Sequence, residues 1–437
     1  MNTPRKRHVI VGTGSRATMF RDALLGRYAP VAELVGLCDI NPLRLAAWQA
    51  EAGLALPSCG PADFEKLLRE QRVDRVIVTS VDRTHHDYIC RAMEAGCDVV
   101  TEKPMTVDAE KCRQILDTQR RTGRRLAVTF NYRYAPRNSK VKELLQDGLI
   151  GRVTSVHFEW VLDTRHGADY FRRWHRDKRN GGGLAVHKST HHFDLVNWWL
   201  GTRPETVMAM GGLRFYGREN AEARGEPRAY LRGSSEAAAG DPFALDLRKN
   251  DGHRRLYLEC EAADGYLRDQ NVFGDGISIE DELSLLVRYE NRAVMTYHLT
   301  AFAPWEGYRV AFTGTKGRLE LEVVENPFCA PEGEDANQVK NVRGASPHPV
   351  TEDATLIYRP HWAEPVKIEI PQAGGGHGGG DHRLLDDVFS NAPEPDPLGR
   401  AAGHEDGAWS ILTGVAANRS LATDAPVRVR DLAAGVE

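Results

Sequence analysis

The feature of this sequence that most limits its fold is a regular alternation of short apolar runs with helical stretches. Continuous runs of Val, Ile and Leu separated by helices are typical of a parallel sheet that is covered on both faces. The alternation therefore predicts a doubly wound α/β domain. The expected strands lie at residues 8–11, 34–38, 76–79, 97–100 and 126–130, and the expected helices at 16–27, 42–52, 63–70, 84–95 and 107–122.

The loop after the first expected strand has the spacing of a dinucleotide-binding turn, G-x-G-x-x-[GA]. Its first glycine permits a tight turn, and its second lets the backbone approach a pyrophosphate. The start of the following helix supplies free N–H groups and the positive end of a dipole. A strand before the motif and a helix after it favour cofactor binding over an ordinary glycine-rich turn. The motif consists of Gly12, Thr13, Gly14, Ser15, Arg16 and Ala17.

An acidic residue closes the second expected strand and indicates which nicotinamide dinucleotide binds. The Asp39 carboxylate can accept hydrogen bonds from ribose hydroxyls, and it repels a 2′-phosphate by like charge. The sequence therefore predicts NAD as the cofactor, with NADP less favoured. Arg16 and Arg44 are arguments for NADP, because a nearby arginine can hold the additional phosphate.

A lysine stands at the end of the fourth expected strand, on the side of an open α/β sheet where ligands bind. Lys103 precedes Pro104, which keeps it out of helical geometry. An ammonium group close to an oxidised, cationic nicotinamide is disfavoured, so its pKa should fall. Such a lysine can take the proton of a hydroxyl while hydride leaves the carbon. The alternative is a solvated lysine before a proline.

A helix with several proton-transfer groups is expected over residues 184–200. The helical spacing places His187, His191 and Asp194 on one stripe, which makes a candidate acid/base cluster. In that arrangement Asp194 is expected to orient His191.

We predict that Lys103 and His191 are the main proton-transfer residues, with His187 and Lys188 as further candidates. Histidines at this spacing are alternatively structural core residues or metal ligands, since positions i and i+4 of a helix suit a metal ion. Lys188 stands where a metalloprotease carries a glutamate, and its positive charge opposes a divalent cation. No metal site is therefore predicted.

These motifs together resemble the Gfo/Idh/MocA family of oxidoreductases, densely over residues 8–200 and more loosely over 272–320. The most specific point of resemblance is the triplet Glu102-Lys103-Pro104. The others are the strand–Gly12-Thr13-Gly14–helix unit, Asp39-Ile40-Asn41-Pro42, Thr79 with His85, Asn131-Tyr132-Arg133-Tyr134 and Gly148-Leu149-Ile150-Gly151-Arg152-Val153.

The resemblance implies an N-terminal dinucleotide-binding domain and a C-terminal α/β domain whose large open sheet covers the active site. It also implies sugars or cyclitols as substrates, Lys103 in the active site, and a homo-oligomer, a dimer or tetramer, built on the exposed sheet. The implied cofactor-binding residues are Gly12, Thr13, Gly14, Ser15, Arg16, Asp39, Thr79, Ser80, His85, Glu102 and Lys103.

The histidine-rich stretch departs from the family's pattern, in which Gly-Gly is followed by Asp, His and Asp. His191 and Asp194 match the last two positions, but His187 stands where the family has its first aspartate. Ser189-Thr190 displaces the usual glycine before the histidine.

Residues 163–176 form an expected loop in which aromatic side chains alternate with Arg and His. Aromatic faces stack on sugar C–H surfaces while Arg and His donate to hydroxyls, so this loop is a candidate carbohydrate pocket. The alternative is a polar loop with an aromatic anchor. The predicted substrate-binding residues are Lys103, Arg133, His166, Tyr170, Trp174, His191 and His377.

The chain is expected to divide into an NAD-binding domain at 1–130 and a substrate-binding and oligomerisation domain at 131–437. Strand-like alternation over 283–300 and 308–324 predicts a second sheet. This alternation fits an antiparallel or mixed sheet, and the resemblance implies that the sheet is large and open. The expected fold class is a doubly wound parallel sheet followed by an α+β domain with a large, open, mostly antiparallel sheet. Residues 218–255 are polar and lack periodicity, which indicates an insertion or long loop, either a lid or an oligomer contact.

A glycine-rich stretch at 374–382 surrounds His377 and precedes an expected helix. Glycines let the backbone approach a ligand, although a flexible linker has the same composition. Similar His-Gly-Gly-x-Asp stretches occur in NAD-dependent glycosidases of this superfamily, which oxidise a ring hydroxyl transiently, expel the aglycone and re-oxidise NADH. The stretch therefore raises a redox-neutral glycosidase as an alternative function.

Composition excludes several other classes of function. With 57 Lys and Arg against 61 Asp and Glu the formal net charge is −4, so bulk charge does not hold nucleic acid. No apolar run approaches the roughly 18 residues of a membrane span, and no secretory leader is recognised at the N-terminus. The seven cysteines form no C-x-x-C pair, which favours a reducing, cytoplasmic location.

The function predicted from the sequence is an NAD-dependent oxidoreductase that takes hydride from a secondary alcohol of a sugar, glycoside or cyclitol. Lys103 and His191 form the proposed proton relay, and a small polyol or glycoside is the expected partner. The alternatives are the redox-neutral glycosidase that retains its NAD, and a non-catalytic protein that senses sugar or NAD. The presence of both relay residues argues against the sensor.

Overall fold

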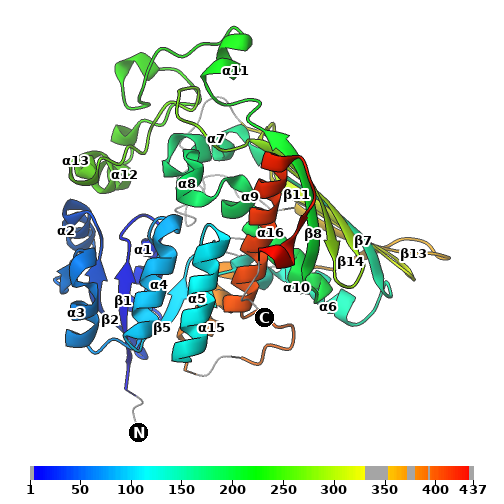
Figure 1. Ribbon diagram of the computed structural model, residues 1–437, viewed down its shortest axis with the longest axis horizontal. Helices are drawn as coiled ribbons and strands as arrows, with labels where there is room; N and C mark the ends of the chain where they lie inside the picture. The colour runs from blue at the N-terminus through cyan, green and yellow to red at the C-terminus, as the bar shows by residue number, and fades with distance from the viewer. Residues whose placement is uncertain (1–3, 330–352, 372–378, 392–393, 433–437) are drawn as a thin grey trace.

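The computed structural model of the protein describes residues 4–329, 353–371, 379–391 and 394–432. Figure 1 shows a smaller N-terminal sheet and a larger C-terminal sheet, with a group of helices between them. None of the helices in these ranges combines the length and the apolar character needed to cross a membrane.

The first sheet contains six parallel strands in the order β3-β2-β1-β4-β5-β6. The strands are β1 (Lys6–Val11), β2 (Ala32–Cys38), β3 (Ser58–Cys59), β4 (Arg75–Val78), β5 (Asp98–Thr101) and β6 (Leu126–Val128). The helices that connect them are α1 (Ala17–Leu25), α2 (Pro42–Glu51), α3 (Phe64–Glu70), α4 (His85–Glu94) and α5 (Ala109–Thr122).

The central strands of this sheet are buried on both faces. Ile10 and Ile77 belong to the apolar cluster that contains side chains of α1 and α2. Val9 and Val76 belong to the cluster that contains side chains of α3, α4 and α5. Successive residues of a strand point to opposite faces, which is why the sequence showed continuous apolar runs here. The predicted doubly wound architecture is confirmed.

The second sheet contains nine strands in the order β14-β13-β12-β11-β7-β10-β9-β8-β15. Among the described residues its neighbouring strands are antiparallel except for β7 and β10, which are parallel. The predicted large, mostly antiparallel sheet is therefore confirmed. The strands are β7 (Val153–Asp163), β8 (Pro204–Gly212), β9 (Glu282–Tyr289), β10 (Val294–Ala303), β11 (Glu306–Gly314), β12 (Gly317–Asn326), β13 (Asp353–Pro360), β14 (Val366–Ile368) and β15 (Val427–Arg428).

One face of the second sheet carries helices, and burial alternates along its strands as expected for a sheet with one packed face. Phe193 on the helix side packs against Tyr297 of β10, with ring centroids 5.2 Å apart. The Ser420 hydroxyl accepts the backbone N–H of Ala209 in β8 at 2.9 Å. The helices of this half are α6 (Pro136–Gln146), α7 (Thr164–Arg172), α8 (Lys178–Gly181), α9 (Leu184–His187), α10 (Thr190–Leu200) and α16 (His404–Thr423). A further helix, α15 (Gly380–Phe389), follows the second sheet in the chain but packs with the first sheet and α1.

Two local predictions in this half were wrong. The single helix expected over 184–200 is divided into α9 and α10, because the Ser189 N–H bonds to the carbonyl of Leu184, five residues back, and breaks the regular helical pattern. The loop expected over 163–176 is mostly helix α7, which starts where the Asp163 carboxylate accepts the N–H groups of Arg165 and His166.

Between β8 and β9 the chain makes a long detour, residues 213–281, which we call the excursion. It contains the predicted insertion at 218–255 and carries the short helices α11 (Arg218–Ala223), α12 (Asp251–Leu256) and α13 (Glu261–Asp264). Figure 1 shows α12 and α13 next to α2 of the first half. The Arg44 Nε of α2 donates to the carbonyl of Leu256 at 3.0 Å, so the excursion contacts the nucleotide-binding half directly.

We predict that Gly414→Ala destabilises the protein although alanine favours helices. Gly414 lies in α16, where an added Cβ would clash with the backbone carbonyl of Ala185 in α9. A rigid backbone cannot yield as a side chain can, so the overpacking should cost about 2 kcal/mol. Urea unfolding measures the effect. The control Gly60→Ala, at a position with open space and a φ of −80°, should change the unfolding free energy by less than about 0.5 kcal/mol.

Candidate active site

A cavity of about 1030 Å³ lies where the carboxyl ends of the parallel strands meet α7–α10 and the excursion. Ligands of open α/β sheets bind at this edge. Most residues predicted to form the site line the cavity together. These are Gly12, Gly14, Ser15, Arg16, Asp39, Thr79, Ser80, His85, Glu102, Lys103, His166, Tyr170, Trp174, His187, Lys188 and His191.

The glycine-rich loop after β1 has the geometry needed at a dinucleotide pyrophosphate. Gly12 has a φ of +87°, and a Cβ there would lie 2.7 Å from the backbone of Ser80, so only glycine fits. Helix α1 begins without a side-chain cap, so the positive end of its dipole is available to an anion in the cavity. The Ser15 N–H in this loop donates to the Tyr257 hydroxyl at 2.8 Å. These residues fit a dinucleotide.

Asp39 holds the glycine-rich loop in place. One carboxylate oxygen accepts the Thr13 N–H at 2.6 Å and the Thr13 hydroxyl at 3.0 Å, and the other accepts the Asn41 N–H at 2.8 Å. Thr13 is completely buried and does not line the cavity. It therefore acts through Asp39, and its predicted direct contact with the cofactor is corrected.

Arg16 and His85 join loops around the cavity. The Arg16 guanidinium donates to Glu102 at 2.6 Å, so it is paired with the loop after β5. His85 bridges two backbone carbonyls, that of Pro104 at 2.8 Å and that of Ser80 at 3.0 Å. These contacts fix the relative positions of the segments that follow β4 and β5.

Lys103 belongs to a chain of three polar side chains, of which Asp82 is buried and Lys103 and His187 are partly buried. Its amine lies 3.5 Å from Nε2 of His187 and 3.4 Å from the His187 carbonyl. On the other side of the ring, Nδ1 of His187 makes a short hydrogen bond to the Asp82 carboxylate. A neutral imidazole that donates from Nδ1 to the carboxylate presents its Nε2 lone pair to the amine.

Burial shifts the pKa of each member of this chain toward its uncharged form. It lowers the pKa of the Lys103 amine, while the charges of Asp82 and Glu102 act in the opposite direction. Burial and the nearby Lys103 charge hold the pKa of His187 well below its usual value. Burial raises the pKa of the Asp82 carboxyl. A lysine with a lowered pKa is available as a base closer to neutral pH.

Sequence reasoning missed Asp82. The sequence could have indicated Asp82 through its position shortly after β4, at the same edge of the sheet as Asp39 and Lys103. Its partner His187 is 105 residues away in the chain, so no local pattern connects the two.

The predicted role of Asp194 as the residue that orients His191 is corrected by the structure. Asp194 accepts two hydrogen bonds from Arg133, at 2.8 and 2.5 Å. His191 lines the cavity, and its ring packs against Tyr132 with centroids 4.6 Å apart. Lys188 also lines the cavity, with its ammonium 4.6 Å from the centroid of the Trp160 ring.

Arg133 is not placed for the predicted contact with substrate. Only 2% of the residue is exposed and it does not line the cavity. Besides Asp194, its guanidinium binds Asp406 of α16 at 2.8 Å. We therefore assign it the structural role of joining α10 to α16.

Aromatic and imidazole rings form the wall of the cavity next to His187. The rings of Tyr170 and Trp174 each lie 5.7 Å from that of His187. His175, which sequence reasoning did not select, stacks on Trp174 at 3.6 Å. His166 contacts the buried Glu306 at 2.8 Å. His377, the remaining predicted substrate residue, lies outside the described residues.

Within the described ranges, no group of three or more His, Cys, Asp or Glu side chains is arranged to hold a metal ion.

Comparison with known families identifies this architecture. The model of the oxidoreductase family's NAD-binding Rossmann fold matches residues 6–130, and the model of its C-terminal alpha/beta domain matches residues 142–429. The chain belongs to the Gfo/Idh/MocA oxidoreductase family. The resemblance seen in the sequence is thus confirmed, and this member of the family is an oxidoreductase that uses a nicotinamide cofactor.

Two relatives extend the comparison. A Bacillus subtilis protein named as the oxidoreductase YteT is 37% identical, over 98% of this chain and 98% of its own. The inositol 2-dehydrogenase of Rhizobium meliloti is 30% identical over 54% of this chain and 73% of its own.

Among solved structures, the WlbA dehydrogenase from Bordetella pertussis, in complex with NADH and UDP-GlcNAcA, superimposes with a TM-score of 0.63. The match covers 98% of this chain and 99% of that one at 17% identity, and it shows that the Gfo/Idh/MocA fold is shared.

We predict that Arg133→Met lowers stability by about 3–5 kcal/mol, because it leaves the Asp194 carboxylate buried and unpaired. Thermal and urea unfolding measure this. Arg121→Met removes an exposed pair with Glu94 and should cost less than about 1 kcal/mol. An Arg133→Met protein with unchanged stability and a raised KM for substrate would contradict the structural role.

Proposed function

We propose that the protein is an NAD-dependent dehydrogenase that oxidises a secondary alcohol of a sugar, glycoside or cyclitol. The observation that carries this proposal is the partly buried Lys103 amine, held next to His187 in the cavity that the glycine-rich loop and Asp39 also line. The inositol 2-dehydrogenase relative supports a polyol as the substrate class.

The cofactor would be held by the N-terminal half. The glycine-rich loop and the positive end of the α1 dipole suit its pyrophosphate, and Asp39 suits the ribose hydroxyls of the adenosine. When bound, NAD accepts hydride from the carbinol carbon. Asp39 favours NAD over NADP, because its charge repels a 2′-phosphate.

Lys103 takes the hydroxyl proton of the substrate in this proposal. As the C–H electron pair leaves with the hydride, the O–H electron pair forms the second bond of the carbonyl, and the proton moves to the lysine amine. Lys103 must therefore be neutral before the reaction, and the burial that lowers its pKa favours that state.

His187 and Asp82 carry the proton further. Nε2 of His187 faces the amine and can accept a proton from it, and the Asp82 carboxylate stabilises the imidazolium that results. The relay predicted from the sequence paired Lys103 with His191. We now propose His187 as the direct partner of Lys103, with His191 lining the same cavity as a group that can contact the substrate.

The aromatic wall suits a sugar ring. Trp174 and Tyr170 can stack on its C–H faces, and His166 can bond to its hydroxyls. Such a wall favours a polyol ring that presents a face of C–H groups.

The test of the proposed function is oxidation of a panel of sugars, glycosides and cyclitols with NAD, followed by the absorbance of NADH. At least one polyol should give net NADH with matching loss of substrate. A protein that binds no nicotinamide dinucleotide, or binds it and reacts with none of the panel, would contradict the proposal.

A redox-neutral glycosidase is a second candidate, and the position of the excursion favours it. Tyr257 of the excursion bonds to both the N–H and the hydroxyl of Ser15, so this segment covers the glycine-rich loop and would retain a bound cofactor. Release of a sugar from a glycoside without accumulation of NADH would identify this reaction.

We predict that Lys103→Ala lowers kcat by about 10²–10⁴-fold, since it removes the base. NADH binding, measured by fluorescence, should change by less than about threefold, because the pyrophosphate and ribose contacts remain. The matched control is Lys140→Ala, whose amine pairs with Glu143 on the surface of α6, and it should keep full activity. Unchanged turnover in the Lys103→Ala protein would exclude the proposed base.

We predict that Asp82→Asn lowers kcat and moves the acidic limb of the pH–rate profile to lower pH. The limb reports ionisation of Lys103, and the rate of oxidation rises as the amine loses its proton. The Asp82 charge raises the pKa of Lys103, so its removal should lower the limb by about one pH unit. The control Asp87→Asn, on the exposed side of α4, should leave the limb in place. An unshifted limb in Asp82→Asn would show that the carboxylate does not act on the amine.

A further inference from the structure

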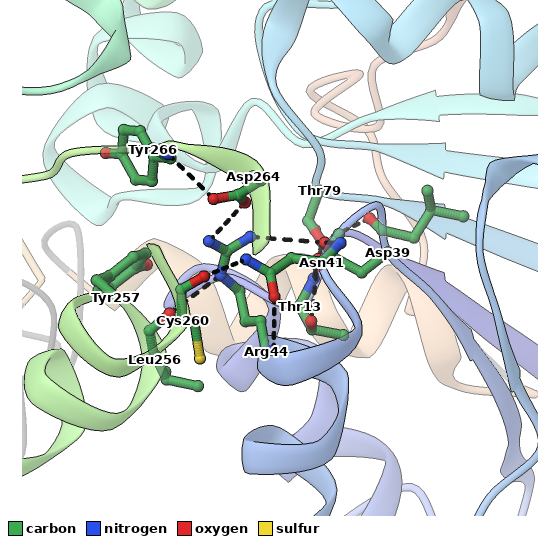
Figure 2. A network of polar contacts seen from close by, with 12 residues as sticks. Thr13, Asp39, Asn41, Arg44, Thr79, Leu256, Tyr257, Cys260, Asp264 and Tyr266 are labelled. Atoms are coloured by element: carbon green, nitrogen blue, oxygen red, sulfur yellow. Dashed lines mark hydrogen bonds and ion pairs between the residues drawn. The ribbon is translucent and has the colours of Figure 1, made fainter. Parts of the chain in front are cut away.

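The excursion forms one wall of the cavity at the end where Asp39 lies. Figure 2 shows its residues facing those that follow β2. The Asn41 amide donates to the carbonyl of Cys260 at 2.8 Å, and the Tyr257 hydroxyl accepts the N–H of Ser15 at 2.8 Å. The wall is thus attached to the glycine-rich loop and to the start of α2 by hydrogen bonds.

Arg44 is the cation next to Asp39 in the cavity, and its guanidinium is held at three points. Nη2 donates to the Asp264 carboxylate at 2.9 Å, Nε donates to the carbonyl of Leu256 at 3.0 Å, and Nη1 lies 3.5 Å from the Asp39 carboxylate. Arg44, Asp39 and Asp264 all line the cavity, and at most 11% of any of these side chains is exposed.

We propose that Asp264 is a specificity-determining residue that excludes NADP from the site. This proposal rests on the proposed function, which places the adenosine ribose of the cofactor beside Asp39. Arg44 is the group that could accept a 2′-phosphate there. Asp264, which belongs to the excursion, already binds this guanidinium. Arg44 favoured NADP in the sequence, but its pairing with a residue 220 positions away makes it unavailable to a 2′-phosphate.

Two costs act against the phosphate. A phosphate monoester brings about −1.5 to −2 charges at pH 7 to a place where two carboxylates already surround one guanidinium. To bind the phosphate, Arg44 must also release Asp264, which would leave a nearly buried carboxylate without its charged partner. The ribose hydroxyls of NAD cause neither penalty. The arrangement therefore distinguishes NAD from NADP by repelling the 2′-phosphate of NADP.

The experiment titrates NADH and NADPH into the full-length protein, freed of co-purified nucleotide, by fluorescence. The wild type should bind NADH at least about a hundredfold more tightly than NADPH. Asp264→Asn, which keeps the shape and removes the charge, should tighten NADPH binding about tenfold or more and change NADH binding by less than about threefold. The control Asp251→Asn, an exposed residue of the same segment, should change neither.

The possible outcomes separate the two proposals. A wild-type protein that binds neither dinucleotide contradicts the proposed function. A wild type that binds both equally, or a folded Asp264→Asn protein with an unchanged ratio of the two affinities, overturns the role of Asp264 and leaves the proposed function standing. If thermal unfolding shows that the Asp264→Asn protein is not folded, the same titrations are made with Asp264→Ser, which also removes the charge. Adding Arg44→Gln to Asp264→Asn should abolish the gain in NADPH binding.

Discussion

The contact on which the rest of the site depends is the one between Lys103 and His187, because it joins the two halves of the chain at the cavity. Lys103 and Asp82 come from the carboxyl edge of the parallel sheet, and His187 comes from α9. A charged amine that is partly withdrawn from water is costly unless it is hydrogen-bonded. The imidazole and the backbone carbonyl of His187 supply those bonds only when the halves are docked in this way, while Asp82, from the same half as Lys103, acts through its charge.

A second joint lies at the opposite end of the proposed cofactor site, where the excursion contacts Ser15, Asn41 and Arg44. A dinucleotide that binds between these joints touches both halves of the chain. Because a ligand stabilises the state to which it binds, the proposed cofactor would also stabilise the docking of the halves. The C-terminal half thereby influences a cofactor site whose predicted motifs all lie in the N-terminal half.

The parts of the site that could be predicted from the sequence are those fixed by single strands. Gly12, Asp39 and Lys103 each follow a strand of the parallel sheet, and the ends of such strands meet at one edge. The pairs formed across the fold could not be predicted in this way. Arg133 binds Asp194 over 61 positions, and no periodicity reports such a partner. Spacing likewise indicated helix at 184–200 but not the break between α9 and α10.

Position 187 shows how a departure from a family pattern can be compensated. The pattern places an aspartate there, and this chain has a histidine whose far nitrogen binds Asp82. The carboxylate is therefore present, but it lies one imidazole ring further from the amine. Coulomb attraction falls with distance, so a carboxylate in this position holds the Lys103 proton less tightly than one in direct contact. In the proposed mechanism the histidine both eases the loss of that proton and provides the nitrogen that accepts it.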